Sequence, residues 1–423
     1  MTVRGWQQLS EGIELPFHPH VRIPDLIDVR LPIVEPEPVP DIEEAARVAV
    51  VSTLGGDVRR GMTVAVGGGS RGLTGRVELL RGTIRALREL GAEPFVVPAM
   101  GSHGGGTAVG QGDMLASLGV TAESVGADIR SSMTTVEIAR TPSGMPLYLD
   151  EHAASADAIL PVNRVKPHTC FRGPVESGCT KMAVVGFGKQ PGAAQIHSCG
   201  PIEMRDRLLD GISTLRATGR LLGGVASVES GSGSVVSVAA LRAAEVGAQA
   251  EEALTVKARD LIPVLPFDDV DVLIVEEGGK DISGTTMDPN VIGRFWVEGL
   301  ADLTSPRVRT IVLLGITENS AGNVLGIGLA DFIPVAVAES IDWAKTYLNC
   351  FTAGSSGVRR SRMPMVLPDE EACIKAALSM CGRDLNLPKR VVRIRSTLHL
   401  TSCQVSEAFL NELPEGSIIS RRT

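Results

Sequence analysis

The sequence predicts an α/β protein with two layered domains, mixed or parallel sheets and an active-site cleft between the domains. Short apolar runs that end in glycine-rich loops alternate with amphipathic segments along the chain, a pattern typical of strands followed by helices. Hydrophobic residues make up 43% of the chain and aromatic residues only 3%, so the core must be mostly aliphatic, which suits α/β layers. At 423 residues the chain is long enough to bury two cores.

The domain boundary is expected in the stretch 263–269, PVLPFDD, which has the composition of a linker. We therefore predict a larger domain over residues 1–265 and a smaller domain over residues 268–390. The C-terminal segment 391–423 begins with strand character and is a candidate to rejoin the larger domain.

The composition argues against several classes of partner. The net charge is −8 and no basic block is present, so we expect no binding to nucleic acid. No apolar run approaches the roughly 20 residues that span a bilayer, and the N-terminus lacks the apolar region of a signal peptide. The seven cysteines are scattered, with no CxxC pair, which favours a reducing, cytoplasmic location.

The N-terminal third begins with a proline-rich arm over residues 1–40. It carries His18 and His20, whose spacing allows metal ligation, although histidines in such an arm are more often surface residues. Helices and strands alternate after the arm. The expected elements are a helix capped by Asp41, a strand at 63–66, a helix that ends at Gly91, a strand that ends near Pro98 and a helix over 107–119.

Glycine-rich loops follow the first two of these strands. The loop GGGSRGLTG contains Arg71, and the free N–H groups and helix dipole beyond such a loop favour an anion. The alternative is that Arg71 is a solvated turn residue. The loop GSHGGGT contains His103, which has few side chains around it to pack against and is therefore a candidate functional residue.

The remaining elements continue the alternation. They are a hairpin turned by residues 142–144, a buried strand within 156–168, a helix over 201–220, a strand hairpin over 223–246, a helix over 250–262, strands from 271 and 310, a helical or part-helical segment over 331–348, a helix over 368–380 and strands within 389–406.

The most informative stretch spans residues 161–200. It holds two histidines, His168 and His197, and Lys181 begins its apolar segment KMAVVGFG. A lysine in that setting suits a partly buried amine that meets a phosphate, a carboxylate or an electrophilic carbon. Loops at one edge of a sheet converge, so we expect this stretch to share a cleft with the loops of Arg71, His103 and Lys280. Such a cleft suits an anionic substrate and proton transfer near neutral pH.

The order of these motifs resembles the nickel-pincer lactate racemase family of 2-hydroxy acid racemases and epimerases. The resemblance rests on an arginine in a glycine-rich loop, then GSHGGGT, then KPHT and SGCTK, and then a histidine sixteen residues after the lysine. It covers about residues 60–300, and the spacing from Lys181 to His197 is its most specific part.

The resemblance implies the cofactor and its ligands. Lys181 would form a thioamide with a pyridinium-3-thioamide-5-thiocarboxylic acid mononucleotide, the nickel-pincer nucleotide, and His197 would be the protein's nickel ligand. We assign Gly69 and Ser70 of the first loop to cofactor binding. The implied partners are the cofactor-biosynthesis proteins that supply this nucleotide, and a homo-oligomer is left open.

The resemblance also implies how the substrate is handled. The α-hydrogen of a 2-hydroxy acid is very weakly acidic, so it would leave and return as hydride rather than as a proton. His103 and His168 would be the two acid/base residues, one for each enantiomer's hydroxyl group. Arg71 would bind the carboxylate, and Lys280 is the looser match to a lysine near the site.

Two departures leave the substrate open. Lactate-type members have an acid three positions before the loop arginine, where this chain has Gly68. The stretch from His168 to Lys181 is also longer, so the second-base assignment of His168 is left open. The longer stretch contains Arg172 and Glu176; we assign Arg172 to a second polar group of the substrate, with a surface position as the alternative.

Two other classes of function compete with the racemase or epimerase. A non-catalytic protein that binds a phosphorylated ligand or a nucleotide would use the same glycine loops. A nicotinamide enzyme of the dinucleotide fold is disfavoured because no GxGxxG stands between a strand and a helix, and a zinc enzyme because HExxH and paired cysteines are absent.

Overall fold

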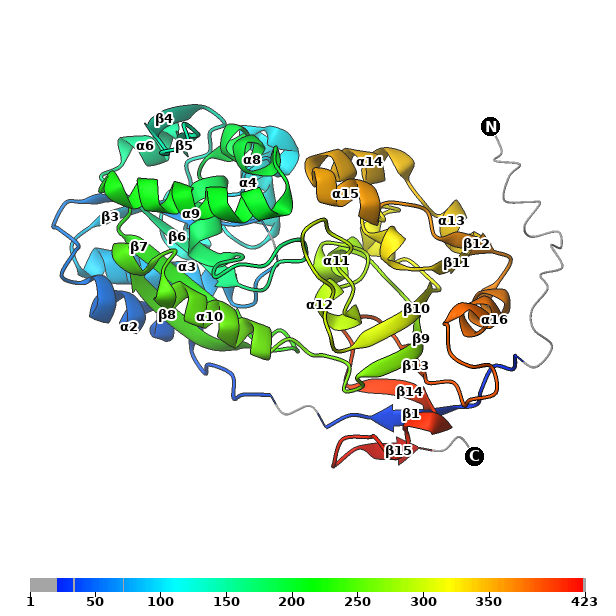
Figure 1. The fold of residues 1–423 in the computed structure, drawn as a ribbon. Coiled ribbons are helices and arrows are strands. Elements are labelled where there is room, and N and C mark those ends of the chain that lie inside the picture. The colour runs from blue at the N-terminus through cyan, green and yellow to red at the C-terminus, as the bar shows by residue number, and fades with distance from the viewer. Residues whose placement is uncertain (1–20, 33–34, 71, 421–423) are drawn as a thin grey trace. The chain divides into compact units, whose positions relative to one another are not determined.

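The computed structural model describes residues 21–32, 35–70 and 72–420. The chain forms two compact units. The central unit is Glu35–Leu261, and the terminal unit combines the described residues before Glu35 with the chain from Ile262 onward. Sheets flanked by helices occur in both units (Figure 1), so the predicted α/β class with mixed and parallel sheets is confirmed.

In the central unit, the described residues form a five-stranded sheet with the order β3-β2-β6-β7-β8. The first four strands are parallel, and the last is antiparallel to its neighbour. A separate hairpin pairs β4 with β5. The strands are β2 (Thr63–Gly68), β3 (Glu93–Pro98), β4 (Thr135–Arg140), β5 (Pro146–Asp150), β6 (Ala158–Val165), β7 (Gly223–Glu229) and β8 (Val235–Arg242).

The helices of the central unit include five that lie close to the predicted positions, namely those that begin at Ile42, Arg76, Ala108, Pro201 and Gln249, whereas the helices within 178–197 were not predicted. The helices of this unit are α2 (Ile42–Leu54), α3 (Arg76–Glu89), α4 (Ala108–Ser117), α5 (Ala122–Val125), α6 (Glu151–Ser155), α7 (Gly178–Lys181), α8 (Lys189–His197), α9 (Pro201–Ala217) and α10 (Gln249–Asp260), with the 3-10 turns η1 (Gly104–Gly106) and η3 (Ala243–Glu245) and the π-helix η2 (Met182–Gly186). The Asp41 side chain caps α2 as predicted, because it accepts the N–H of Glu44 at 2.9 Å.

Both faces of the central sheet are covered. Along β2, Val64 and Val66 point toward helices α2 and α3, whereas Ala65 points toward the opposite core, as the two-residue period of a strand requires. The opposite core contains Met182 of η2 and Leu208 of α9. A strand buried on both faces reads as a continuous apolar run, which is why these strands were visible in the sequence.

In the terminal unit, the described residues form an eight-stranded sheet with the order β12-β11-β10-β9-β13-β14-β1-β15. The strands from β12 to β13 are parallel, and the last three are antiparallel. The strands are β1 (Leu26–Arg30), β9 (Asp269–Val275), β10 (Arg307–Leu313), β11 (Phe332–Pro334), β12 (Met365–Leu367), β13 (Val391–Ile394), β14 (Ser402–Ser406) and β15 (Ile418–Ser420).

Helices cover the terminal sheet in the same way. They are α11 (Lys280–Ser283), α12 (Pro289–Ile292), α13 (Val335–Glu339), α14 (Trp343–Thr352), α15 (Ser355–Arg360) and α16 (Glu370–Met380), with the 3-10 turns η4 (Glu318–Ser320), η5 (Ile327–Leu329) and η6 (Glu407–Phe409). On β9, Leu273 and Val275 pack in one core, while Val272 and Ile274 pack in the other beneath α16.

The units meet between Leu261 and Ile262, beside the predicted linker, but both chain ends belong to a different unit from the one predicted. Strand β13 pairs with β9 in parallel register, Val391 opposite Val272, so the segment after Lys389 joins the terminal sheet and not the larger N-terminal domain. Strand β1 lies between β14 and β15, visible as a blue strand between red ones (Figure 1). The first described residues therefore also belong to the terminal unit, because both chain ends complete one sheet.

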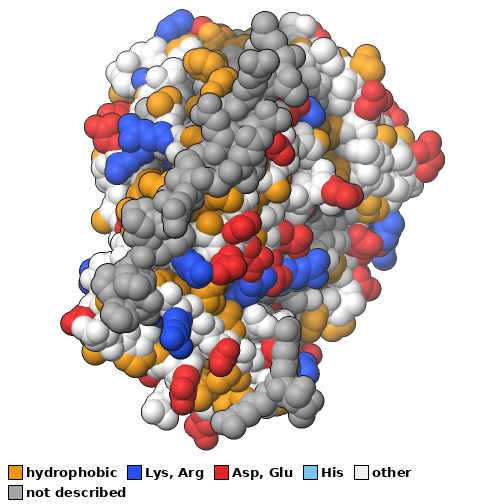
Figure 2. Space-filling model, turned by 90° about the vertical axis from the view of Figure 1, so that its right-hand side faces the viewer, with side chains coloured by type: hydrophobic (Ala, Val, Ile, Leu, Met, Phe, Trp, Pro, Cys, Tyr) orange, Lys and Arg blue, Asp and Glu red, His pale blue; other side chains and the backbone are white. Residues whose placement is uncertain are grey.

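The surface seen in Figure 2 carries acidic and basic side chains next to one another. Ion pairs join such side chains in the terminal unit. Arg393, for example, lies 2.8 Å from Glu276 and 2.6 Å from Glu370. No helix within the described residues is both long enough and apolar enough to cross a bilayer.

Candidate functional site

Lys181 lies where the chain passes from α7 directly into the π-helix η2. All five residues of η2, from Met182 to Gly186, are buried, and α8 begins three residues later and ends at His197. π-Helical turns are rare and are frequent at functional sites. The sequence analysis identified the apolar run but not this conformation, which places the lysine at the edge of a buried segment.

Lys181 and His168 are in direct contact. Nζ of Lys181 lies 2.7 Å from Nε2 of His168. The other ring nitrogen, Nδ1, accepts the backbone N–H of Cys170 at 3.0 Å. A backbone N–H can only donate, so Nδ1 of His168 is the acceptor of this bond, and Nε2 is the ring nitrogen that faces Lys181.

His197 shares this environment. Its Nδ1 lies 2.9 Å from the carbonyl oxygen of Ala193, and because a carbonyl only accepts, Nδ1 carries the proton and Nε2 keeps its lone pair. Burial and the nearby charge of Lys181 lower the pKa of His197 from 6.5 to about 4, with the Ala193 bond opposing them. His197 is therefore neutral at pH 7, the form in which imidazole binds a metal.

A buried carboxylate holds the loop that carries His168. Glu176 is wholly buried, and its Oε2 accepts the backbone N–H of His168 at 2.7 Å and Nη1 of Arg172 at 3.2 Å. Its Oε1 accepts the N–H of Gly173 at 3.2 Å and Nη2 of Arg259 at 2.8 Å. Four donors on one carboxylate fix the loop and compensate the cost of burying the charge.

A second buried carboxylate holds the turn that carries Lys181. Glu251 of α10 accepts the N–H of Thr180 at 3.0 Å, its hydroxyl at 2.6 Å and the N–H of Gly247 at 2.7 Å. Burial raises the pKa of Glu251, against the effect of these bonds. Gly178 adopts a φ of +83°, and a Cβ there would lie 2.7 Å from Oε1 of Glu251, so the close approach requires glycine.

The first glycine loop contacts both the lysine segment and the His103 loop. A Cβ on Gly69 would lie 3.1 Å from Cε of Met182, the residue after Lys181. Ser70 Oγ lies 2.5 Å from Nδ1 of His103, so this hydroxyl orients the imidazole. Arg71 falls outside the described residues, and its assignment to the substrate carboxylate stays a prediction.

Arg76 adds a buried cation at the same loop. It begins α3, is 6% exposed and donates to the carbonyl oxygen of Gly69. Burial and the neighbouring charge of Arg164 lower the pKa of Arg76 to about 10, while Glu229 acts in the opposite direction. Glu229 is itself bound to Arg164 and to the N–H of Thr74. The loop therefore has more positive than negative charge beneath it, as an anion site requires.

The predicted site residues of the central unit are linked in part. Ser70 contacts His103, Lys181 contacts His168 and its charge affects His197, and Gly69 lies against Met182, the residue after Lys181. Arg172 lies in the His168 loop, where its Nη1 also donates to the carbonyl of His168 at 3.0 Å. Its role toward a substrate stays a prediction.

Lys280 belongs to the other unit. It follows β9 in the terminal unit, and its Nζ donates to Oδ1 of Asn349 on α14. The prediction that all four loops leave one sheet edge is therefore wrong for Lys280, because β9 belongs to a different sheet from β2, β3 and β6.

Sequence reasoning missed four residues that hold the site, which are Arg76, Gln111, Lys189 and Glu251. Lys189 lay in the stretch that was singled out, and a lysine between a buried apolar run and PGAA could have been recognised as unusual. Glu251 is distant in sequence from Thr180, and Gln111 is distant from Lys189, although it also binds backbone carbonyls of the loop before its helix. Nothing local marks either residue. His18 and His20 lie outside the described residues.

Metal ligation would rest on His197 in this structure. Within the described part of the chain, no three His, Cys, Asp or Glu side chains are grouped so that they could hold a metal ion. The seven cysteines are all free thiols, and burial raises the pKa of Cys179 well above its ordinary value.

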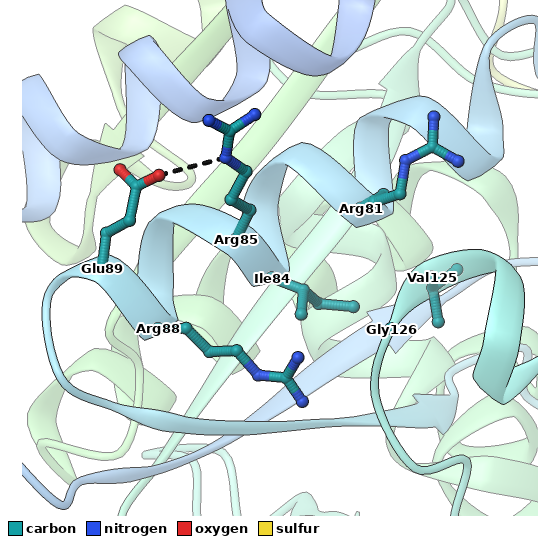
Figure 3. A pocket seen from close by; sticks show the side chains of 7 residues that line it. All are labelled: Arg81, Ile84, Arg85, Arg88, Glu89, Val125 and Gly126. Carbon is teal, nitrogen blue, oxygen red and sulfur yellow. Dashed lines mark hydrogen bonds and ion pairs between the residues drawn. The ribbon is translucent and has the colours of Figure 1, made fainter.

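A surface cavity of about 420 Å³ lies elsewhere on the central unit. Figure 3 shows that arginines of α3 surround it, with Val125 and Gly126 on the other side. Two of these arginines are already paired: Arg81 with Glu43 at 2.6 Å and Arg85 with Glu89 at 3.1 Å. None of the predicted site residues lines this cavity, so we do not assign it to the reaction.

Comparison with known proteins gives limited similarity. No protein-family model and no curated protein sequence matches the chain. The lactate racemase apoprotein from Thermoanaerobacterium thermosaccharolyticum has a TM-score of 0.47 at 14% identity, over 92% of this chain and 91% of that chain. A protein from Thermotoga maritima has a TM-score of 0.46 at 14% identity, over 67% and 72%. At this level neither structure assigns a family or a function to the chain.

Proposed function

We propose that the protein is a racemase or epimerase of 2-hydroxy acids. One observation carries the proposal: Nζ of Lys181 lies 2.7 Å from Nε2 of His168 in the central unit, and the charge of Lys181 lowers the pKa of His197. Two imidazoles and an amine at this spacing combine proton transfer, covalent attachment and metal ligation in one place.

The residues fit a lysine-tethered nickel-pincer nucleotide. Lys181 offers an amine at the edge of a buried segment, and His197 offers a neutral imidazole with a lone pair on Nε2. Arg76 and the loop at Gly69 and Ser70 are suited to hold an anionic part of a nucleotide. When bound, such a cofactor would accept hydride from C2 of the substrate and return it. We propose that cofactor-biosynthesis proteins supply it.

His103 and His168 are the proposed acid/base pair. They lie on separate loops, after β3 and after β6, and different groups orient them: Ser70 binds Nδ1 of His103, and Cys170 binds Nδ1 of His168. The hydroxyl groups of two enantiomers point to different sides, so two bases on separate loops suit a reaction that runs both ways. Arg71, Lys280 and Arg172 stay the proposed contacts of the substrate.

Intact mass and turnover together test the proposal. The protein should be produced with and without the enzymes that make the nucleotide, and then assayed for racemisation or epimerisation across a panel of 2-hydroxy acids. We expect a mass gain of several hundred daltons only in the first preparation, and loss of both the gain and the activity in Lys181→Ala. Lys257→Ala, an exposed lysine of α10, is the matched control and should keep both.

The alternative is a protein that binds a phosphorylated ligand without catalysis. The buried cation Arg76 beside a glycine loop favours it. Cofactor-loaded protein that contains no nickel and turns over no 2-hydroxy acid, yet binds a nucleotide monophosphate through Arg76, would replace our proposal with this one. A cytoplasmic location is part of the proposal and follows from no observation of the fold.

A further inference from the structure

Lys189 has a wholly buried ammonium group outside the proposed chemistry. The side chain is 0% exposed. Its Nζ donates to the carbonyl oxygen of Pro98 at 2.6 Å and to Oε1 of Gln111 at 2.7 Å, and lies 3.2 Å from Oδ2 of Asp150. Burial lowers the pKa of Lys189, and Asp150 opposes this. An ammonium has three protons, and three oxygens surround this one.

The backbone at Lys189 is strained. Its φ is +51°, a left-handed conformation that L-residues other than Gly, Asn and Asp seldom adopt. Such a conformation persists where the surrounding structure imposes it. Because Lys189 is the first residue of α8, this backbone conformation sets how the helix that ends at His197 begins.

Gln111 links Lys189 to the loop of His103. Gln111 is 0% exposed, and while its Oε1 accepts from Lys189, its Nε2 donates to the carbonyl oxygens of Gly101 at 2.8 Å and His103 at 3.1 Å. A primary amide accepts through its oxygen and donates through its nitrogen, so the Gln111 side chain can bridge these groups. The same loop contacts the π-helix, since the N–H of Gly101 donates to the carbonyl of Gly186 at 3.1 Å.

We propose that Lys189 and Gln111 are positioning residues that fix the His103 loop against helix α8. The ammonium of Lys189 binds Pro98 at the end of β3 and Gln111 of α4, and Gln111 in turn binds Gly101 and His103. Lys189 is itself the first residue of α8, the helix that carries His197. The acid/base imidazole is thereby held in register with the helix of the metal-ligating imidazole. The catalytic part of this proposal rests on the proposed function, and the structural part does not.

Gln111→Glu is the sharpest test. The carboxylate still accepts from Lys189, and the pair gains charge complementarity, so the fold should be kept. It cannot donate to the carbonyl oxygens of Gly101 and His103, and its second oxygen would face them. We expect kcat to fall about 10- to 100-fold, as for a small misplacement of a catalytic group, with KM and the mass of the cofactor adduct unchanged.

Hydrogen exchange provides a readout that does not depend on activity. In the apo protein, the amides of residues 101–106 should exchange about tenfold faster in Gln111→Glu, because the loop loses two hydrogen bonds. The control is Thr83→Val, which removes a buried hydroxyl bonded only to Leu79 within α3 of the same unit. It should leave both kcat and exchange at 101–106 as in the wild type.

A double variant covers the case in which Gln111→Glu fails to fold. Lys189→Met with Asp150→Asn removes both charges, and Asn keeps the oxygen that accepts from the N–H groups of His152 and Ala153. It should give the same faster exchange at 101–106. Unchanged exchange in whichever variant folds would overturn the proposal, and so would faster exchange spread evenly over the central unit. If the loaded wild type turns over no hydroxy acid, the proposed function fails, and exchange at 101–106 alone decides whether the pair holds the loop.

Discussion

Two sheet edges of this molecule carry a glycine-containing segment followed by a lysine, and they use their polar groups differently. In the terminal unit, Asp281 accepts the hydroxyls of Thr317 at 2.6 Å and Ser320 at 2.9 Å, while Ser320 accepts the N–H of Lys280. Burial raises the pKa of Asp281, but these hydroxyls bring it below its ordinary value. The loop after β9 is thus closed by its own side chains and by the neighbouring loop.

At the central-unit edge, buried carboxylates hold the backbone and leave the reactive nitrogens in contact with one another. Glu176 and Glu251 accept N–H groups of the loops that carry His168 and Lys181. The side chains of those loops then contact each other, Lys181 with His168 at 2.7 Å. The difference teaches that a strand, a glycine loop and a lysine do not define a site. A site forms where residues from other elements hold the loop backbone, so that the loop side chains contact one another and do not bind their own loop.

Replacing either proposed acid/base histidine of the central-unit edge should lower kcat far more than replacing the lysine of the terminal-unit edge. We expect His103→Asn and His168→Asn each to lower kcat by about 10²- to 10⁴-fold, the usual contribution of general acid–base catalysis. Because each imidazole would deprotonate the hydroxyl group of one enantiomer, each variant should retain oxidation of one enantiomer to the 2-keto acid better than oxidation of the other. Single-turnover formation of the keto acid from each enantiomer, measured on cofactor-loaded protein, tests this.

The terminal edge supplies the control for this experiment. Lys280→Met should raise KM with a much smaller change in kcat, since Lys280 is proposed to contact the substrate and not to transfer protons. If Lys280→Met lowered kcat as far as the histidine variants do, the distinction between the two edges would be wrong.

Some of this arrangement was predictable from sequence and some was not. The central strands of both sheets, β2, β6 and β9, are largely buried apolar runs and were visible in the sequence. The charge of Lys181 affects His197, but that the two residues share a cofactor stays a prediction. The division of the chain was not predictable, because β1, β14 and β15 come from opposite ends and pair through backbone bonds that carry no sequence signal. Glu251 was missed because it binds loop backbone 71 residues away along the chain. Gln111 was missed although the carbonyl oxygens that it binds are only 8 and 10 residues away, because backbone donors and acceptors are the same for every sequence.

The second comparison is between the carboxylates that hold the two loops, Glu176 in the central unit and Asp281 in the terminal unit. Glu176→Gln should lower the free energy of unfolding of the central unit by about 3–5 kcal/mol, because it removes the buried partner of two arginines. Asp281→Asn, in a more exposed loop, should cost about 1 kcal/mol, the net value of a hydrogen bond. Urea unfolding of the apo proteins measures both. Equal costs for the two variants would show that burial does not distinguish these loops.

The smallest expected effect is the change in the pKa of His197 when the charge of Lys181 is removed. His197 has a pKa of about 4, below 6.5, from burial and from Lys181. Lys181→Met removes the cation and leaves the burial, so the pKa of His197 should rise but remain below 6.5. Because the unfolded chain binds this proton more readily than the native protein, His197 contributes stability fully above pH 6.5 and loses it as the pH falls toward 4. This loss of stability should be smaller in Lys181→Met.

Imidazole ¹⁵N shifts of apo protein between pH 4 and 7 measure the pKa of His197, and melting temperatures over the same range measure the loss of stability, with Lys257→Met as the control. If the pKa of His197 does not move in Lys181→Met, the two side chains do not share one environment, and the proposed tether and metal ligand would have to be assigned to different places.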